Sequence, residues 1–465
     1  MKNASVDSRK RVLFQTLGCK LNHYETLGLE AAFRRAGFTV VEEGPAGIVV
    51  VNSCAVTAEA VRQSLQTVRR ARKRHPEARI FLAGCAVMAE AEKCRQLAGV
   101  EAGFGNAGKA ELVEWVVRGV PEGETIPVLV ELSGELPISS LRADSIRGRS
   151  RAELKIQDGC NSFCRYCIIP YLRGRCRSLP PEKVFAECEE LAAAGFREIV
   201  LTGIHLGRYG DDLGDPAGEG FTRLLLELTQ RFPELRFRLG SLQPHEITPA
   251  IIDLLLDPVS PVCEHLHLSL QSGSDRVLGA MGRPYRRAAI EKLFDRLAAG
   301  RGRLNLGTDL IVGFPAENEA AFRETRSLVE SVALSYLHLF PYSPRRGTVA
   351  GSWPDRVPAG VKKERLKILS EIGRQKKKCF VDSNLNTILE VLVEKKMGPD
   401  KSLSEGGWFG HSRNYLPVLV EDGDVGDEAA GKAAEEVSEE ITGKVVKARA
   451  VSWDGRKIAA RRILG

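Results

Sequence analysis

The run from Leu154 to Cys167 reads Leu-Lys-Ile-Gln-Asp-Gly-Cys-Asn-Ser-Phe-Cys-Arg-Tyr-Cys, with three cysteines spaced C-x3-C-x2-C after a strand-like apolar start. Four-iron clusters are held by Cys thiolates, and closely spaced cysteines on one loop can reach a single cluster. Because Cys160, Cys164 and Cys167 supply only three thiolates, one iron of such a cluster would have no protein ligand. An open iron can bind a substrate or cofactor, so the loop favours catalysis over electron transfer.

Two structural alternatives use the same three cysteines. One is a zinc site that lacks a ligand, although zinc normally takes four ligands and often pairs two C-x2-C units. The other is a disulfide with a spare thiol, which would be unusual in a reducing cytosol.

The composition is that of a globular protein. At 465 residues the chain is long enough for about three domains. Its first ten residues contain no apolar segment, and no apolar run approaches the roughly 18 residues of a membrane span. We therefore expect a cytoplasmic protein without a membrane anchor, in which the 11 cysteines are kept reduced and grouped thiols bind metal.

The formal charge of +7 hides a more basic body. Residues 421–440 contain nine acids and one lysine, which leaves the rest of the chain with a charge of +15. A charge of this sign suits a polyanionic partner such as nucleic acid. The acidic segment itself is predicted to be an exposed insertion.

Residues 11–145 alternate strand and helix patterns. Strands are predicted at 12–17, 47–51 and 79–83, and helices at 23–36 and 57–74. This alternation predicts a parallel, doubly wound sheet. Each strand is followed by a cysteine, namely Cys19, Cys54 and Cys85, and ligands of such sheets bind outside the carboxyl ends of the strands.

The three cysteines would therefore meet at one sheet edge and bind a second cluster with an open iron. The alternative is three separate buried cysteines, which are common in protein cores. Cys94, in a helical stretch, is predicted to be a structural thiol.

Residues 146–380 form the predicted central domain. Strands are expected at 154–158, 198–204, 235–240, 264–270, 305–313 and 335–340, and helices at 181–194, 221–230, 248–256, 286–299 and 319–331. Six such units predict a partial (β/α)6 barrel with its chemistry at the carboxyl ends of the strands.

Polar or small residues stand where these strands end: Thr202, Gly203, Ser241, Gln271 and Asp309. They are candidates for cofactor contacts. Ordinary turn chemistry is the alternative for each of them.

The last part of the chain changes pattern. Residues 361–378 hold eight bases and two acids, which predicts a helix that is either solvated or in contact with phosphates. Short strands follow at 387–393, 413–420, 443–452 and 456–460. The region 381–465 is therefore predicted to be a small closed β-barrel, a fold often used on RNA loops.

The cysteine loop, with Tyr166 just before its third cysteine, resembles the radical S-adenosylmethionine (radical SAM) superfamily. The whole chain resembles the methylthiotransferases of that superfamily, and its C-terminal barrel resembles a TRAM domain, a tRNA-contacting module. The motifs that carry the resemblance are the three N-terminal cysteines and the runs Ile168–Gly174, His267–Asp275, Thr308–Pro315 and Phe340–Arg345.

The first motif, Thr16–Asn22 followed by Tyr24-Glu25-Thr26, resembles the branch that acts on N6-threonylcarbamoyladenosine at tRNA position 37. The related branches act on isopentenyladenosine or on an aspartate of a ribosomal protein, and both are alternatives here. The chain departs from the usual pattern at several positions, which are His23, Ser53, Ala86, Met88, Cys176 and Ala316.

The resemblance implies two [4Fe-4S] clusters, one on Cys160, Cys164 and Cys167 and one on Cys19, Cys54 and Cys85. It also implies that S-adenosyl-L-methionine binds near Tyr166 and the polar strand ends, and that two such molecules support methylthiolation of carbon 2 of the adenine. The implied partners are the tRNA anticodon loop, a low-potential electron donor and a sulfur donor. An alternative of another class is a non-catalytic iron–sulfur protein that binds RNA. Cys176, Cys188, Cys263 and Cys379 are predicted to be structural thiols.

Overall fold

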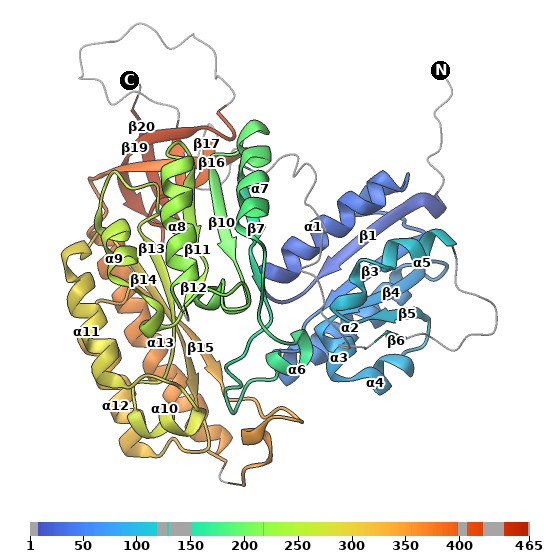
Figure 1. Ribbon diagram of the computed structural model, residues 1–465, viewed down its shortest axis with the longest axis horizontal. Helices are drawn as coiled ribbons and strands as arrows, with labels where there is room; N and C mark the ends of the chain where they lie inside the picture. Colours follow the sequence, from blue (N-terminus) through green and yellow to red (C-terminus); the bar gives the residue numbers. More distant parts are fainter. Residues whose placement is uncertain are drawn as a thin grey trace, which may run out of the picture.

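The structure, a computed structural model, describes residues 8–118, 128–129, 150–216, 218–354, 356–398, 407–421 and 441–463. An N-terminal α/β unit lies beside a larger central α/β unit, and a small β-barrel lies at one end of the central unit (Figure 1). The predicted domain boundary at 145/146 and nearly all of the predicted acidic insertion fall outside the described residues. No helix in the described segments is both long and apolar enough to cross a bilayer.

The N-terminal unit is a six-stranded parallel sheet of order β2-β1-β3-β4-β5-β6. Its strands are β1 (Arg11–Thr16), β2 (Thr39–Val41), β3 (Ile48–Ser53), β4 (Arg79–Gly84), β5 (Val100–Phe104) and β6 (Val128–Leu129). Its helices are α1 (Lys20–Arg35), α2 (Ala58–Arg74), α3 (Cys85–Ala89), α4 (Ala91–Arg95) and α5 (Leu112–Arg118), with short 3-10 turns η1 (Ser8–Lys10) and η2 (Ala107–Lys109).

Both faces of this sheet are buried. Val49 and Val51 of β3 pack in one core with α2, whereas Ile48 and Val50 pack in another with α1 and α5. Successive side chains of a strand point to opposite faces, so an unbroken apolar strand requires a helix layer on each side. The doubly wound prediction is confirmed.

The central unit contains parallel strands in two sheets, with orders β11-β10-β7 and β12-β13-β14-β15. The strands are β7 (Arg151–Lys155), β10 (Glu198–Thr202), β11 (Arg236–Leu239), β12 (Ser241–Leu242), β13 (His265–Gln271), β14 (Asn305–Val312) and β15 (Tyr336–Pro341). The sheets meet at Gly240, between β11 and β12. Six strand positions around a curved surface agree with the predicted partial barrel.

Helices cover the outer face of these strands. They are α7 (Pro181–Ala193), α8 (Gly220–Arg231), α9 (Pro249–Leu256), α10 (Asp275–Met281), α11 (Arg287–Leu297) and α12 (Glu319–Ser331), with 3-10 turns η3 (Leu206–Arg208), η4 (Pro244–Glu246) and η5 (Ala298–Gly300). Leu266, Leu268 and Leu270 of β13 belong to the core formed with these helices. The alternate residues His265, His267 and Gln271 therefore face the inside of the partial barrel. The short helix α6 (Ile169–Arg173) instead packs against α3, and its Leu172 belongs to a core of the N-terminal unit.

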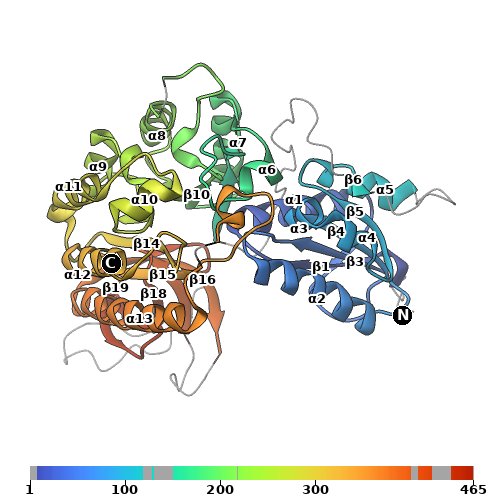
Figure 2. The same ribbon diagram turned by 90° about the horizontal axis from the view of Figure 1, so that it is seen from below.

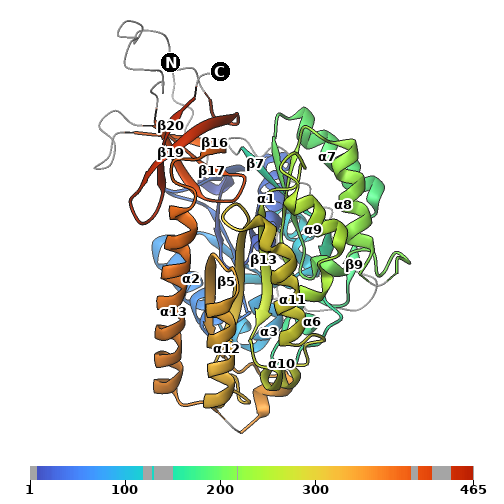
Figure 3. The ribbon, with the colours of Figure 1, turned by 90° about the vertical axis from the view of Figure 1, so that its left-hand side faces the viewer.

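The C-terminal region forms a closed barrel. Its strands are β16 (Ile388–Met397), β17 (Gly407–Ser412), β18 (Pro417–Glu421), β19 (Val445–Trp453) and β20 (Ile458–Arg462). The basic helix α13 (Ala359–Asp382), which follows η6 (Val349–Ser352), runs beside α12 and leads into this barrel (Figure 3).

The small barrel contacts the amino ends of the central strands. Arg151, at the start of β7, pairs with Glu394 at 2.8 Å, and Arg236, at the start of β11, pairs with Glu390 at 2.8 Å. Asn305, at the start of β14, donates to the carbonyl oxygen of Asn414 at 2.7 Å. The small barrel thus closes the end of the partial barrel opposite the cysteine loop.

Candidate active site

The Cys160 loop follows β7 and is bracketed by a short antiparallel pair, β8 (Gln157–Asp158) and β9 (Arg177–Ser178). Gly159 opens the loop with a φ of 73°, and a Cβ at this position would collide with the backbone of Arg175. Phe163, inside the loop, has a φ of 42°, an uncommon conformation for a bulky residue. Such backbone strain is typical of functional sites. The loop therefore lies at the strand end where a parallel barrel places its chemistry.

Cationic and N–H groups point at two sulfurs of this loop. Arg283 donates from Nη1 to Sγ of Cys164 at 3.3 Å, and Nδ1 of His205 lies 3.4 Å from Sγ of Cys160. The backbone N–H of Ser162 also donates to Sγ of Cys160, at 3.5 Å. Donors of this kind stabilise thiolates, so the three sulfurs suit the ligand set of an iron–sulfur cluster.

Neighbouring charged groups shift the pKa values of side chains at this loop. Burial, together with smaller contributions from negative charges on Cys164 and Cys160, raises the pKa of the Cys167 thiol to about 12. Burial alone would lower the pKa of His205. The contacts of His205 with Cys160 and Glu246 outweigh this effect and raise the pKa to about 9. His205 is thus a cation at neutral pH beside Cys160.

The residues predicted to contact the cofactor differ in their surroundings. The ring of Tyr166 lies edge-on to Phe314, with centroids 6.5 Å apart. Gly203 packs against Gln157, whose amide donates to the carbonyl oxygen of Gly159 at 2.8 Å. Thr202 instead donates its hydroxyl to the carbonyl oxygen of Leu154 at 3.1 Å, inside the sheet.

The remaining three predicted contacts lie on neighbouring strands. Gln271 ends β13 with a φ of 67°, where the pairing with β14 shifts register, and Ser241 is exposed at the start of β12. Asp309 lies in the middle of β14, and its carboxylate contacts His267 and His338. Asp309 therefore lies deeper in the strand than the sequence suggested.

The N-terminal cysteines follow β1, β3 and β4 at the carboxyl edge of their sheet. Gly18, which precedes Cys19, lies against Cys54 so closely that a Cβ would stand 2.8 Å from its Sγ. Ser53, which precedes Cys54, accepts at Oγ a hydrogen bond from the N–H of Ala86 at 3.1 Å, next to Cys85. The three loops are therefore held together by contacts between the residues that flank the cysteines.

Electrostatics shows the same proximity. Burial raises the pKa of the Cys54 thiol to about 11, and charges on Cys85 and Cys19 add to the increase. Asn106 donates to Sγ of Cys85 at 3.4 Å and to the carbonyl oxygen of Leu172 in α6 at 3.0 Å. Three thiols with an amide donor suit a second iron–sulfur ligand set.

A buried ion network joins the two cysteine sites. Glu25 of α1 contacts Lys109, lies 3.0 Å from Lys155 and lies 2.9 Å from Arg173 of α6. Arg173 and Lys155 also contact Asp158, at 3.2 and 2.7 Å, two residues before Cys160. All five side chains are almost fully buried. Figure 2 shows α6 at the junction between the two α/β units.

Arg173 extends this network to the N-terminal cysteines. Its Nη2 donates to Oδ1 of Asn22 at 2.9 Å, and Asn22 donates to the carbonyl oxygen of Ser53 at 3.0 Å. Burial acts to lower the pKa of Arg173, but the charges on Glu25 and Asp158, and to a smaller extent on Cys85 and Cys19, raise it well above its usual value. One buried guanidinium thus connects Asp158, near Cys160, with Asn22, which contacts Ser53 next to Cys54.

Aromatic and cationic side chains lie together at the end of the partial barrel that the small barrel closes. Tyr415, in the β17–β18 turn, has a φ of 64° and lies 4.8 Å from the ring of His265. The guanidinium of Arg238 lies 4.4 Å from the Tyr415 ring, and Nζ of Lys20 lies 5.6 Å from it. Lys20 follows Cys19 directly, and the described residues give it no carboxylate partner. The Lys20 ammonium therefore lies near the end of the partial barrel that the small barrel closes.

The other cysteines behave mostly as structural thiols. Cys94, Cys188 and Cys263 are buried, and burial is the main reason that their pKa values are raised. Cys176 is buried beside the cysteine loop, where it accepts from the amide of Gln157 at 3.5 Å. Cys379 is exposed on α13, so it has no core role.

The basic helix α13 uses several of its charges internally. Arg365 is buried and pairs with Glu317 at 2.8 Å, and Lys376 donates to the carbonyl oxygen of Val332 at 2.7 Å. Both residues dock the helix on the central unit. Only part of its predicted basic surface is therefore free to contact phosphate groups.

Sequence reasoning did not single out His205, Arg283, Glu25 or Arg173. His205 comes two residues after the predicted contact Gly203, at the same strand end, so its position could have revealed it. Arg283 follows the α10 helix and had no such signal. Glu25 and Arg173 lay inside quoted motifs, but their contact joins residues 148 apart in the chain.

Two family models match the chain. One, described as the radical SAM superfamily, covers residues 154–329, and the other, described as uncharacterized protein family UPF0004, covers residues 11–105. Among solved structures, the radical S-adenosylmethionine methyltransferase TsrM from Kitasatospora setae is similar at a TM-score of 0.53 and 17% identity, over 74% of this chain and 75% of that one. The similarity to this solved structure concerns the fold alone.

Curated relatives align over most of the chain. Threonylcarbamoyladenosine tRNA methylthiotransferase MtaB from Bacillus subtilis (strain 168) is 34% identical over 94% of this chain and 93% of its own length. The protein of the same name from Aquifex aeolicus (strain VF5) is 35% identical over 82% of this chain and 92% of its own. tRNA-2-methylthio-N(6)-dimethylallyladenosine synthase from Moorella thermoacetica is also 35% identical, over 85% of this chain and 89% of its own.

Proposed function

The chain belongs to the radical SAM tRNA methylthiotransferases, and we propose that it adds a methylthio group to carbon 2 of N6-threonylcarbamoyladenosine at position 37 of tRNA. The observation that carries this proposal is the pair of three-cysteine sets joined by the buried contacts of Arg173 with Glu25 and Asp158. One site alone would suit many radical SAM reactions. Two sites allow one to activate S-adenosyl-L-methionine and the other to hold sulfur.

Each site fits one [4Fe-4S] cluster. Cys160, Cys164 and Cys167 would hold the first, and S-adenosyl-L-methionine would bind its open iron. When bound, this pair supplies radical chemistry that can act on an unactivated C–H bond such as that at carbon 2 of adenine. Cys19, Cys54 and Cys85 would hold the second cluster, and a second S-adenosyl-L-methionine would supply the methyl group.

The protein's own residues would bind and orient S-adenosyl-L-methionine. Tyr166, Gly203, Ser241 and Gln271 would contact S-adenosyl-L-methionine, and Thr202 would support them through the sheet. Asp309 is left out of this group, because two imidazoles occupy its carboxylate.

The partners follow from the chemistry. A tRNA anticodon loop would be held by the small barrel and by the exposed bases of α13, and an unpaired loop nucleotide is inexpensive to turn out of its stack. Such a substrate places the reaction in the cytoplasm. The reaction also needs a low-potential electron donor and a sulfur donor.

Lys20 favours the threonylcarbamoyl substrate over the isopentenyl one. The threonylcarbamoyl group carries a carboxylate, whereas the isopentenyl group is apolar. The ammonium of Lys20 lies 5.6 Å from the centroid of the Tyr415 ring, where a substrate carboxylate would pair with it. An apolar substituent would leave this cation without a partner.

Nucleoside mass spectrometry tests the proposal. tRNA from a strain that lacks the gene would be compared with tRNA from the same strain with the gene restored. We expect restoration of 2-methylthio-N6-threonylcarbamoyladenosine alone. Restoration of the isopentenyladenosine product would refute the substrate, and no change in either nucleoside would refute tRNA methylthiolation and favour the ribosomal protein or a non-enzymatic role.

A further inference from the structure

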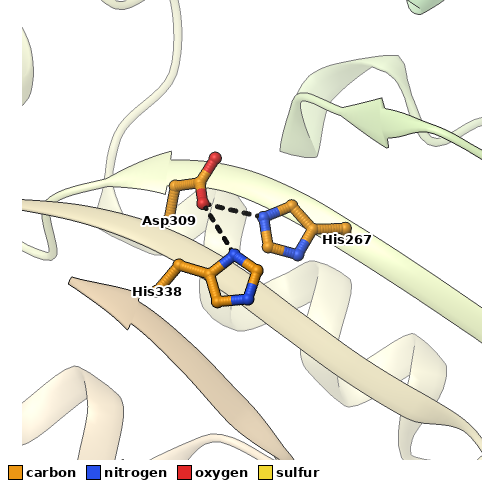
Figure 4. Close-up of side chains that lie close together, drawn as sticks. All are labelled: His267, Asp309 and His338. Atoms are coloured by element: carbon orange, nitrogen blue, oxygen red, sulfur yellow. Dashed lines mark ion pairs between the residues drawn. The ribbon is translucent and has the colours of Figure 1, made fainter. Parts of the chain in front are cut away.

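Three potential metal ligands, none of them a cysteine, meet on the inner face of the central sheet. His267 of β13, Asp309 of β14 and His338 of β15 point toward one another (Figure 4). Nε2 of His267 lies 3.0 Å from Oδ1 of Asp309, and Nδ1 of His338 lies 3.4 Å from the same oxygen. The three ligand atoms all lie within 4.8 Å of one another.

Strand register explains why these side chains meet. Asp309 is the direct pairing partner of His338, and His267 pairs with Gly307, two residues before Asp309. Residues two apart in a strand share a face, so all three side chains lie on one surface of the sheet. The site is therefore built on three rigid adjacent strands.

A tyrosine fixes the ring of His267 from behind. The hydroxyl of Tyr336 lies 3.0 Å from Nδ1 of His267 and 2.8 Å from Nε2 of His265. Tyr336 can reach across β14 only because Gly307 has no side chain, since a Cβ there would fall inside the Tyr336 ring. Histidines that bind metals usually have such a partner on the other ring nitrogen, which orients the ligand.

The spacing of the ligand atoms suits a metal ion. Bonds of about 2.0–2.1 Å to histidine and carboxylate ligands place neighbouring ligand atoms roughly 3.0–3.4 Å apart. The two observed separations, 3.0 and 3.4 Å, fall in this range. Exposure increases from His267 at 10% through Asp309 at 26% to His338 at 56%, so an ion could enter from the His338 side.

We propose that His267, Asp309 and His338 bind one divalent transition-metal ion of the Zn2+ or Fe2+ type. Two imidazoles and one carboxylate suit these ions better than Mg2+ or Ca2+, which prefer all-oxygen sites. Three protein ligands leave coordination positions open for an oxygen ligand such as water, a carboxylate or a phosphate. The proposal is independent of the methylthiotransferase function.

Zinc binding tests the proposal in protein whose cysteine sites already hold iron. Equilibrium dialysis with micromolar Zn2+, followed by metal analysis, would give the zinc bound per chain at constant iron content. X-ray absorption at the zinc edge would then identify the ligand atoms. The variants are His338→Gln, whose side chain is half exposed and so not needed for folding, and Asp309→Asn, with His75→Gln at the end of α2 as the matched control.

We expect one zinc ion in a nitrogen and oxygen shell without sulfur. His338→Gln and Asp309→Asn should each weaken binding about tenfold or more, Tyr336→Phe should weaken it about 10–100-fold, and His75→Gln should leave it unchanged. A sulfur shell, equal binding by wild type and both ligand variants, or no zinc bound to the wild type would each overturn the proposal.

Discussion

Arg283 and His205 place positive charge on the sulfurs of the Cys160 loop. Arg283 is held in place by its own partners, because Nε donates to the Tyr285 hydroxyl and Nη2 donates to the carbonyl oxygen of Ser269, both at 2.8 Å. Hydrogen bonds to the sulfurs and nearby charge set the reduction potential of iron–sulfur clusters. These two residues are therefore expected to tune the cluster without binding it.

Arg283→Gln should lower the midpoint potential of the Cys160 cluster, because a reduced cluster is more negative and gains more from a cation. A hydrogen bond to a charged group is worth about 1.5–3 kcal/mol. Only part of this energy differs between the oxidised and the reduced cluster, so the midpoint potential should fall by on the order of tens of millivolts. A redox titration followed by electron paramagnetic resonance, in a Cys54→Ala background, measures it. The exposed residue Arg276 provides the control, Arg276→Gln; an unchanged potential in Arg283→Gln would contradict the tuning role.

Lys20→Met should raise KM for tRNA that contains threonylcarbamoyladenosine, by about tenfold or more, because the lost charge-assisted contact is worth about 1.5–3 kcal/mol. The rate at saturating tRNA should change less, since Lys20 binds substrate and does not take part in the chemistry. Steady-state kinetics on modified and unmodified tRNA measure both. An unchanged KM would remove Lys20 from substrate recognition.

The sequence predicted the residues that carry a spacing signal and missed those that act through distant contacts. Cys19, Cys54 and Cys85 follow β1, β3 and β4, and Cys160, Cys164 and Cys167 lie in the loop after β7 and β8. His205 and Arg283 meet the loop only in the folded chain, because 45 and 119 residues separate them from the sulfurs they contact.

At the level of elements, long apolar runs predicted strands well. β3, β4, β10 and β14 lie within a few residues of their predicted positions. β5 reads Val-Glu-Ala-Gly-Phe, and β2 has three residues, so neither gives a clear pattern. The predicted strand 413–420 was wrong in part, since residues 413–416 form a turn around Tyr415, and β17, with two glycines, was missed.

Strands β10 and β11 depend on a buried ion pair. Arg238 donates from Nε to Glu198 at 2.7 Å and from Nη2 to its other oxygen at 3.0 Å. Burial acts to raise the pKa of Glu198, but Arg238 outweighs it and lowers the pKa to about 2. The pair therefore stabilises the fold fully only above the unfolded pKa of about 4.3.

As the pH drops from about 4.3 to 2, the Glu198–Arg238 pair should lose about 3 kcal/mol of its contribution to wild-type stability. The reason is that Glu198 binds a proton more readily in the unfolded chain than in the folded one. Glu198→Gln should lose about 3–5 kcal/mol at pH 7, since Arg238 keeps its charge without a partner, and should show a smaller pH dependence. Urea unfolding of metal-free protein at each pH measures both. Glu59→Gln, on an exposed surface, should match the wild type; an equal pH dependence in Glu198→Gln would contradict the account.

Across the whole molecule, the Glu25 network holds the two α/β units together. It contains two carboxylates, Glu25 and Asp158, and three cations, Lys109, Lys155 and Arg173, all buried at the junction. Composition and periodicity place charged residues on the surface, so sequence patterns could not predict this junction. It joins α1, which follows Cys19, to the segment that carries Cys160.

Glu25→Gln should destabilise the protein by about 3–5 kcal/mol, because it leaves buried cations with one carboxylate. Glu30→Gln, on the same helix in a more exposed pair with Arg34, should cost less than about 1 kcal/mol. Thermal unfolding would measure the difference. Equal effects of the two substitutions would show that the network does not hold the junction.

The most direct test of the two-site account compares Cys160→Ala with Cys54→Ala, using reduced, iron-reconstituted protein and tRNA that contains threonylcarbamoyladenosine. Cleavage of S-adenosyl-L-methionine and formation of the methylthio nucleoside would be measured in the same reaction. We predict that Cys160→Ala abolishes both, whereas Cys54→Ala still cleaves S-adenosyl-L-methionine and forms no methylthio product. Full product from Cys54→Ala would contradict the division of labour between the two sites.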